Sequence, residues 1–278
     1  MTVSKIIHQT WKTTDVPERW KRSEREWRAY CEAYGWEYKL WTDDDNRALI
    51  QEHYPWFVRQ FDAYKYNIMR ADAVRYFILH RHGGVYVDLD IAPKAERFHT
   101  LFQLYEESDV TLGMTKSGNN LAGLNYTNCL MMSSPKSPFW PLVWEYLVNP
   151  FRNGGAWKRV PAMTHYFHVL MGTGPPMVSA AANQYEGEGH TIHKVPAMFL
   201  QPGTEYDIKP IDTPESAVVV LDGSSWHETD ANVWRTLQTN VVNNWSVISV
   251  ALVVMLIATT YYFAALYRRA LEPHPSRW

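Results

Sequence analysis

The stretch YKYNIMRADAVRYFILHRHGGVYVDLDI, residues 64–91, decides the fold of this chain. Its first part carries apolar residues at helical spacing and ends at Gly83 and Gly84, which terminate a helix. The apolar residues that follow, VYVDLDI (85–91), predict a strand. A helix, a glycine turn and a strand in such close order are typical of the second half of a crossover unit. We therefore expect an α/β fold in which the neighbouring strands are parallel.

Asp88 and Asp90 lie one residue apart at the end of this predicted strand. Alternate residues of a strand share a face, so both carboxylates are expected to point the same way, with Leu89 buried behind them. In an open α/β sheet, ligands bind beyond the carboxyl ends of the strands, and two hard oxygen donors there suit Mg²⁺ or Mn²⁺ carrying substrate phosphates. An Asp-x-Asp triplet alone is a weak signal, but its position after a Gly-Gly strand strengthens it.

Asp72 and Arg75 are three residues apart and therefore lie on one face of the predicted helix. An isolated pair of this kind is more often a structural ion pair than a functional one. Because this helix leads directly to Asp88 and Asp90, we favour a functional interpretation for both residues.

The rest of the chain alternates between strand and helix patterns, which supports a single α/β domain. Strands are expected at SKIIHQTW (4–11), WEYKLW (36–41), DVTLGM (109–114), NCLMMS (128–133), HKVPAMF (193–199) and AVVVLDGSSW (217–226). Helices are expected at PERWKRSEREWRAYCEAYG (17–35), TDDDNRALIQEHY (42–54), YPWFVRQFDAY (54–64), FWPLVWEYLV (139–148) and TGPPMVSAAANQY (173–185).

The amino-acid composition limits the kinds of ligand that the chain is expected to bind. The formal net charge of −2 argues against a nucleic-acid ligand, which needs a basic surface. Aromatic residues make up 14% of the chain, and they suit either a large core or stacking on bases and sugars. The two cysteines, Cys31 and Cys129, show no CxxC spacing, so we expect buried thiols, with a single disulfide as the open alternative.

The segment VISVALVVMLIATTYYFAAL, residues 247–266, has no charge over the length that a membrane-spanning helix requires. Aromatic residues lie near both of its ends, and Arg268 and Arg269 follow it, which is the flanking pattern of a transmembrane helix rather than a buried core helix. The arginines predict that the tail after Leu266 faces the cytosol and that the large domain faces the lumen. The N-terminus has no apolar signal-peptide core, however, and a C-terminal anchor alone would leave the main domain in the cytosol.

The expected organisation is therefore a catalytic domain, a juxtamembrane linker, a membrane span and a short tail. These four parts are assigned to residues 1–235, 236–246, 247–267 and 268–278.

Three segments together resemble glycosyltransferase family 32, which has a DxD sugar-binding motif. They are IIHQTWK (6–12), YNIMRADAVRYFILHRHGGVYVDLD (66–90) and GLNYTNCLMMSSPKSPFW (123–140), and the resemblance extends over residues 5–228. It implies a GT-A fold, a Rossmann-like nucleotide-sugar-binding fold, that transfers a sugar with retention of configuration. The family usually has Ser-Asp where this chain has Ala71-Asp72, a variant that loses a hydroxyl but keeps the carboxylate.

The resemblance also implies the roles of individual residues. Asp72 and Arg75 would hold the donor sugar, Asp88 would contact ribose or sugar and the metal, and Asp90 would be a direct metal ligand; these four are the expected catalytic residues. The third metal ligand would be His227. The remaining contacts to the nucleotide sugar are expected at Ile7, His8, Gln9, Thr10, Trp11, Asn128 and Trp226. The segment GTGPP (172–176) would be a supporting turn beneath the site.

Within the family, the chain looks most like the catalytic subunits of mannosyl inositol phosphorylceramide synthase. That likeness implies GDP-mannose as donor, inositol phosphorylceramide in a bilayer as acceptor, a divalent metal (Mn²⁺ or Mg²⁺), a small regulatory membrane subunit and a Golgi or other endomembrane location. No motif demands a protein nucleophile, although Asp72 is a candidate, and we expect attack by the acceptor on the face that the diphosphate leaves.

Three alternatives stay open. A family member could use a UDP-sugar, could act on a protein-linked or lipid-linked glycan, or could bind carbohydrate without catalysis. A phosphotransferase is disfavoured because the chain has no phosphate-cradling GxxxxGK[ST] loop.

Overall fold

The computed structural model describes residues 2–115, 126–149, 165–200 and 211–221, together with Met255 and Thr259. The chain divides into two compact units, 1–227 and 228–278. In the described part of the chain, no helix is long and apolar enough to cross a membrane. The predicted span at 247–267 lies outside the described residues, apart from its two described positions, and so do the predicted domain boundaries.

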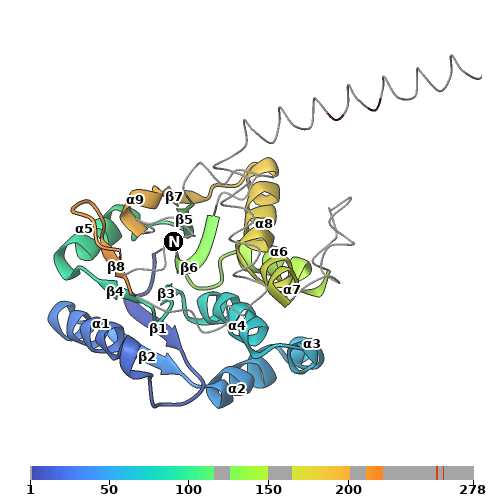
Figure 1. Cartoon of the computed structure of the whole chain (residues 1–278), viewed down its shortest axis with the longest axis horizontal. Helices are drawn as coiled ribbons and strands as arrows, with labels where there is room; N and C mark the ends of the chain where they lie inside the picture. Colours follow the sequence, from blue (N-terminus) through green and yellow to red (C-terminus); the bar gives the residue numbers. More distant parts are fainter. Residues whose placement is uncertain are drawn as a thin grey trace, which may run out of the picture. The chain divides into compact units, whose positions relative to one another are not determined.

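A six-stranded sheet forms the centre of the first unit, in the order β2-β1-β3-β6-β5-β7 (Figure 1). Its strands are β1 (Ile6–Thr10), β2 (Glu37–Trp41), β3 (Gly84–Val87), β5 (Val110–Met114), β6 (Tyr126–Ser133) and β7 (His193–Val195). The predicted α/β class is confirmed. The expectation of parallel neighbours holds for β1, which pairs in parallel with β2 and β3, but β3 pairs with β6 in the antiparallel sense.

Helices cover both faces of this sheet (Figure 1). The described α-helices are α1 (Lys21–Tyr34), α2 (Asp43–His53), α3 (Val58–Ala63), α4 (Asn67–His82), α5 (Ala95–Tyr105), α6 (Phe139–Val148), α7 (His165–Gly172), α8 (Pro175–Gly187) and α9 (Ala197–Leu200). On one face, Trp27 of α1 and Phe98 of α5 share a hydrophobic cluster with Val85 of β3. On the other, Phe77 of α4 and Trp140 of α6 share a second cluster with β-sheet residues. Alternate residues of β3 thus enter different cores.

Local signals in the sequence place most of these elements correctly. Gly35 ends α1 in the left-handed conformation with φ 68°, and Thr42 caps α2 in a reciprocal capping box with Asp45. Helices α5 and α7 were not predicted from the sequence. The strand predicted at 193–199 is wrong in its second half, since β7 ends at Val195 and the short helix α9 follows. Cys31 and Cys129 are both free thiols, so the disulfide alternative is wrong.

The predicted strand at 85–91 is in fact two strands of different sheets. Strand β3 ends at Val87, the backbone N–H of Asp88 donates to Cys129 at 2.8 Å, and a turn at Leu89 and Asp90 follows. The chain then forms β4 (Ile91–Pro93), which pairs with β8 (Val218–Val220) in a separate two-stranded sheet. The reason lies in Leu89, which is buried in a third hydrophobic cluster that also contains Trp20, Val219 and Leu221.

Close packing requires the two glycines at the start of β3. Gly83 and Gly84 have φ values of 65° and 86°, which residues with a side chain rarely adopt. A Cβ atom would lie 2.7 Å from the Pro135 ring at Gly83 and 2.6 Å from the Ile6 carbonyl oxygen at Gly84. The two glycines therefore let α4 turn directly into β3 against β1.

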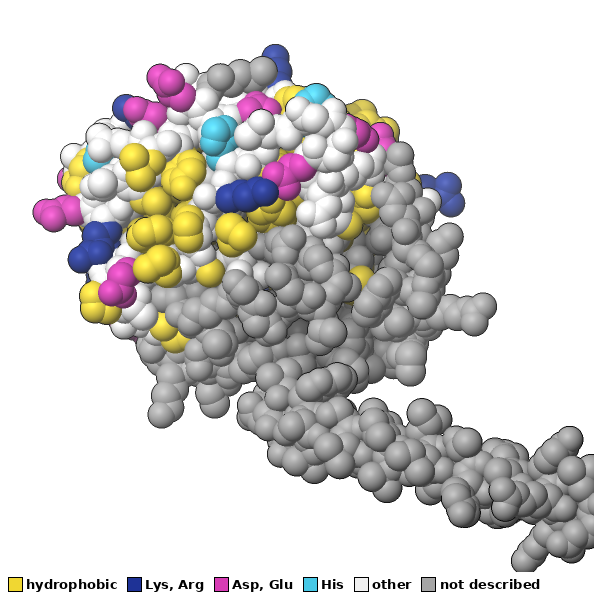
Figure 2. Space-filling view, turned by 90° about the horizontal axis from the view of Figure 1, so that it is seen from above, with side chains coloured by type: hydrophobic (Ala, Val, Ile, Leu, Met, Phe, Trp, Pro, Cys, Tyr) yellow, Lys and Arg dark blue, Asp and Glu magenta, His cyan; other side chains and the backbone are white. Residues whose placement is uncertain are grey.

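Charged residues of both signs are interspersed on the described surface that Figure 2 shows. This mixed arrangement agrees with the small formal net charge of −2.

Candidate functional site

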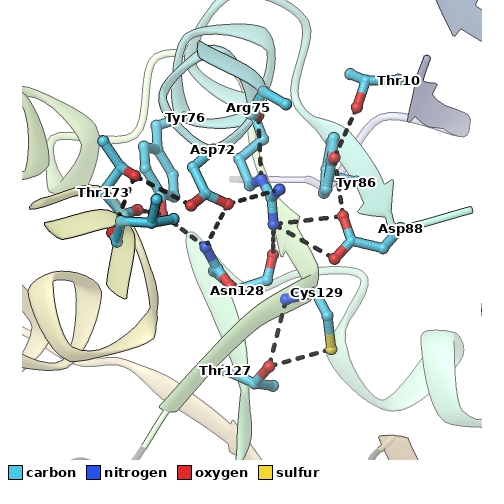
Figure 3. A network of polar contacts seen from close by, with 12 residues as sticks. Thr10, Asp72, Arg75, Tyr76, Tyr86, Asp88, Thr127, Asn128, Cys129 and Thr173 are labelled. Atoms are coloured by element: carbon cyan, nitrogen blue, oxygen red, sulfur yellow. Dashed lines mark hydrogen bonds and ion pairs between the residues drawn. The ribbon is translucent and has the colours of Figure 1, made fainter. Parts of the chain in front are cut away.

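The predicted catalytic residues meet at the carboxyl edge of β1 and β3. In the parallel register His8 pairs with Tyr86, so Thr10 at the end of β1 lies beside Asp88 at the end of β3. Helix α4 contributes Asp72 and Arg75, and β6 contributes Asn128. Figure 3 shows these side chains converging, with Arg75 between the two aspartates.

Arg75 is the centre of this arrangement. Its side chain is 4% exposed, and its Nη2 lies 2.8 Å from Asp72 Oδ1 while its Nη1 lies 3.3 Å from Asp88 Oδ1. Nη1 also donates to the Asn128 backbone carbonyl at 2.8 Å, and the guanidinium lies over the Tyr86 ring. Burial opposes the positive charge, but Asp88 and Asp72 hold the pKa of Arg75 well above its usual value. The guanidinium is therefore fixed and permanently charged.

Asp72 is held by three different donors. Besides Arg75, the Thr173 hydroxyl donates to its Oδ2 at 3.0 Å, and the Asn128 side-chain amide donates to its Oδ1 at 3.3 Å. Burial raises the pKa of Asp72 to about 6 even though Arg75 lowers it. The expected supporting turn at 172–176 thus supplies a direct contact through Thr173, which the sequence analysis did not name.

Asp88 is positioned by a tyrosine. The Tyr86 hydroxyl donates to Asp88 Oδ1 at 3.0 Å and lies 2.9 Å from the Thr10 hydroxyl, which links the ends of β1 and β3 (Figure 3). Burial raises the pKa of Asp88, although Arg75 and the Tyr86 hydroxyl oppose that rise. Tyr86 was missed from the sequence, but a signal existed: in a strand it lies two residues before Asp88 and so on the same face.

Asp90 is half-buried and forms no ion pair with a described residue. Burial, followed by the neighbouring charge of Asp88, raises its pKa to about 7. Its backbone carbonyl accepts a bond from the Leu221 N–H at 2.6 Å, at the end of β8. The main chain of Asp90 is therefore fixed by the fold while its carboxyl group lacks a partner of opposite charge among the described side chains.

Among the described residues, the site thus has more acidic groups than the buried Arg75 can balance. Asp72 and Asp88 share Arg75, and Asp90 has no partner in the described structure. Carboxylate oxygens from adjacent residues are the ligands that Mg²⁺ and Mn²⁺ prefer. Asp88 and Asp90 therefore fit a divalent cation. Among the described residues there is no cluster of three or more acidic, histidine or cysteine side chains that could hold a metal ion.

The structure separates the five residues predicted at the end of β1. Ile7 and His8 lie in the core: the His8 ring contacts the Gly83 carbonyl at 3.0 Å and accepts from the Trp41 indole at 3.1 Å. Burial lowers the pKa of His8 to about 3. Ile7 shares a hydrophobic cluster with Val85, and the His8 ring contacts Gly83 just before β3, whereas Asp88 follows the other end of that strand, so these two side chains are core residues.

The other three lie nearer the site. The buried Gln9 side chain donates to the Asp88 backbone carbonyl at 3.4 Å and accepts from the Tyr38 hydroxyl at 2.8 Å. Thr10 contacts Tyr86, as described above, and Trp11 is half-buried with its ring 5.3 Å from that of Trp20. The predicted Trp226 and His227 lie outside the described residues.

Comparison with known proteins agrees with this geometry. Residues 17–106 match the glycosyltransferase sugar-binding region containing the DXD motif. The chain is 34% identical over 241 residues to mannosyl phosphorylinositol ceramide synthase CSH1 of Saccharomyces cerevisiae. The aligned region covers 87% of this chain and 57% of that protein. It is 32% identical to inositol phosphoceramide mannosyltransferase 2 of Schizosaccharomyces pombe, over 83% of this chain and 60% of that protein.

The chain spans about three fifths of the length of these two relatives. Among solved structures, the ligand-free glycosyltransferase domain of the YGT toxin gives a TM-score of 0.45 at 9% identity, over 70% of this chain and 80% of that one, a likeness too weak to identify the fold. The sequence match includes Asp88 and Asp90 at the sheet edge. The chain therefore belongs to the glycosyltransferases whose sugar-binding region contains a DXD motif.

Proposed function

We propose that this protein is a membrane-anchored, metal-dependent, retaining α-mannosyltransferase with a GT-A fold. It transfers mannose from GDP-mannose to inositol phosphorylceramide. The observation that carries the chemistry is the pair of acidic side chains, Asp72 and Asp88, that share the buried Arg75 guanidinium, with the carboxyl group of Asp90 two residues further along the turn. The donor and acceptor are supported by the names of the two yeast relatives, which are a mannosyl phosphorylinositol ceramide synthase and an inositol phosphoceramide mannosyltransferase.

A divalent cation held by Asp88 and Asp90 would supply positive charge to the departing nucleoside diphosphate. The protein side chains orient the reacting groups. Tyr86 and Arg75 hold Asp88 in place, and the fixed Asp72 carboxylate offers a hydrogen-bond acceptor for a sugar hydroxyl. Asp72 already accepts three hydrogen bonds, which makes it a poor nucleophile and favours attack by the acceptor hydroxyl on the face that the diphosphate leaves.

The acceptor and the anchor belong together in this proposal. A domain tethered by the apolar segment 247–267 would meet a lipid substrate at the bilayer surface. A lumenal catalytic domain in the Golgi and a small regulatory membrane subunit complete the proposal. Nucleic acid is not a partner in it.

The test is turnover of nucleotide sugars by the full chain with Mn²⁺. We expect GDP-mannose to be consumed, mannosylated inositol phosphorylceramide to form when that lipid is present in vesicles, and chelation to stop both. Asp90→Ala removes the carboxyl group but keeps the backbone bond from Leu221, so it should fold and lose turnover. Equal rates in the two proteins would refute catalysis at this site and favour a carbohydrate-binding protein.

Testing several nucleotide sugars and several acceptors in the same assay shows separately whether the donor, the acceptor or sugar transfer itself is wrongly assigned. If a UDP-sugar is consumed while GDP-mannose is ignored, the mannosyl assignment is wrong but sugar transfer stands. If GDP-mannose is consumed and only glycans accept the sugar, the lipid acceptor is wrong.

A further inference from the structure

A second cation lies beside the aspartate turn and has no role in the chemistry described so far. Arg19 belongs to η1 (Glu18–Trp20), in the loop that follows β1. Because Thr10 lies beside Asp88 in the parallel register, the residues after Thr10 leave the sheet at the same edge as the aspartates. The loop that carries Arg19 therefore borders the candidate site.

Packing fixes this loop against the turn. The Arg19 guanidinium lies over the Trp20 ring, 4.2 Å from its centre, and the Trp20 ring meets that of Trp11 at 5.3 Å. Trp20 is 3% exposed and shares a hydrophobic cluster with Leu89, the residue between the two aspartates. A guanidinium stacked on a ring keeps its N–H groups available in the plane of the fork. Arg19 is thus held near the aspartate turn by stacking, without a hydrogen bond from its guanidinium to any residue that the structure describes.

Arg19 also differs from the other arginines of this region in its partners. Arg75 is buried and paired with Asp72 and Asp88, and Arg22 is paired with Glu26 at 2.8 Å. Arg19 is exposed and forms no ion pair within the described part of the chain.

We propose that Arg19 binds the diphosphate group of the nucleotide donor, at the solvent side of the Asp88–Asp90 turn. The inference rests on the proposed function. A nucleoside diphosphate carries more negative charge than one divalent cation neutralises, and a guanidinium fork binds phosphate oxygens through two parallel N–H bonds. Arg75 cannot do this while its N–H groups hold Asp72, Asp88 and the Asn128 carbonyl.

The test compares nucleotide binding by the full-length wild-type chain and Arg19→Ala in the presence of Mn²⁺. Competition against a fluorescent GDP analogue gives the affinities of GDP and of guanosine, which lacks phosphate. We expect Arg19→Ala to bind GDP roughly tenfold more weakly, as for loss of a hydrogen bond to a charged group, and to bind guanosine unchanged. Arg19→Lys should recover part of the loss. Arg22→Ala removes the same charge three residues along and should bind both ligands as the wild type does.

Two outcomes would overturn the inference and leave the proposed function standing: GDP affinity equal in the wild type and Arg19→Ala, or an equal loss for GDP and guanosine, which would mean that the loop has lost its shape. A wild-type chain that binds neither GDP nor UDP would overturn the proposed function, and this inference with it.

Discussion

At the scale of single residues, neutral hydroxyl groups orient the acidic side chains of the site. Tyr86 holds Asp88 and Thr173 holds Asp72, each through one hydrogen bond of 3.0 Å. These bonds add no charge, so they fix the carboxylates without competing with a cation for them. Arg75 balances the negative charge from beneath.

Tyr86→Phe is therefore expected to separate positioning from charge. The phenyl ring can stay under Arg75, but the bonds to Asp88 and Thr10 are lost. We expect roughly tenfold weaker Mn²⁺ binding in a manganese titration, since the lost bond joins a hydroxyl to a charged group. Tyr54→Phe removes a hydroxyl that contacts His80 in the core and should leave Mn²⁺ binding unchanged. Unaltered Mn²⁺ affinity in Tyr86→Phe would mean that Asp88 needs no orienting group.

Asp90 predicts a specific pH dependence of the metal-free protein. The unfolded chain loses this proton near pH 4, whereas the folded chain keeps it up to about pH 7, so ionisation costs stability as the pH rises between these values. Asp90→Asn removes that cost and should raise the melting temperature at pH 8 but hardly change it at pH 4. Asp62→Asn is the control, because the hydrogen bond from Arg47 lowers the pKa of Asp62, so this variant should not raise the melting temperature at pH 8. An equal effect of Asp90→Asn at both pH values would contradict the raised pKa.

At the scale of elements, the junction of α4 and β3 positions the whole site. Helix α4 carries Asp72 and Arg75, and β3 leads to Asp88. Only Gly83 lies between the end of α4 and Gly84, the first residue of β3. Any change in the path of this junction would move the arginine relative to the aspartate that it holds.

Gly84→Ala tests how tightly the junction is built. The new Cβ would lie 2.6 Å from Ile6 of β1 at a φ of 86°, so both a clash and backbone strain are expected. We expect a loss of at least about 2 kcal/mol in the free energy of unfolding, measured with urea. Gly35→Ala has a similar φ of 68° but nothing within 4 Å, so it should show only the conformational cost, about 1 kcal/mol. Equal losses in the two variants would show that close packing at Gly84 is unimportant.

At the scale of the whole molecule, the site is where two sheets meet. The chain leaves the six-stranded sheet at Val87 and enters the two-stranded sheet at Ile91. The second sheet is completed by β8, far along the sequence, and Lys94 adds contacts to Asp212 and the Thr213 carbonyl. A cation bound by Asp88 and Asp90 would therefore stabilise a point through which distant parts of the fold are joined.

This arrangement predicts that Mn²⁺ stabilises the protein in a pH-dependent way. Binding must displace the proton that Asp90 holds up to about pH 7, so the affinity should fall by up to about tenfold per pH unit below that value. We expect the rise in melting temperature with Mn²⁺ to be clear at pH 8 and nearly lost at pH 5. Asp90→Ala should show little rise at either pH. A rise of the same size at pH 5 and pH 8 would place the cation elsewhere.

Much of the fold and part of the site can be predicted from the sequence, and the differences have physical reasons. Some features depend on local interactions and can therefore be predicted from the sequence. They are the helical spacing in α4, the glycine pair, and the residues that cap α1 and α2. The break between β3 and β4 is not, because it depends on where Leu89 finds its hydrophobic partners, and these come from distant segments. The antiparallel β3–β6 pair has the same origin, since pairing direction is set by long-range contacts.

The same limit applies to the site residues. Asp72, Arg75 and Asp88 stand close together in the sequence and meet in space, with Asn128 brought to them by β6. The periodicity of β1 alone could not assign His8 to the core, because a central strand is buried on both faces and either face can point to a cluster. Thr173 reaches Asp72 from more than 100 sequence positions away, a contact that no local pattern encodes.

The turn that separates Asp88 from Asp90 limits how this protein can be altered by insertion or deletion. Adding or removing one residue there would withdraw Leu89 from its pocket and shift Ile91 out of register with Val220, so the small sheet and the acidic pair would be lost together. Length variants at this position should therefore be recovered as misfolded protein rather than as folded protein that lacks activity. Engineering of donor preference is better directed at the side chains around this turn than at its length.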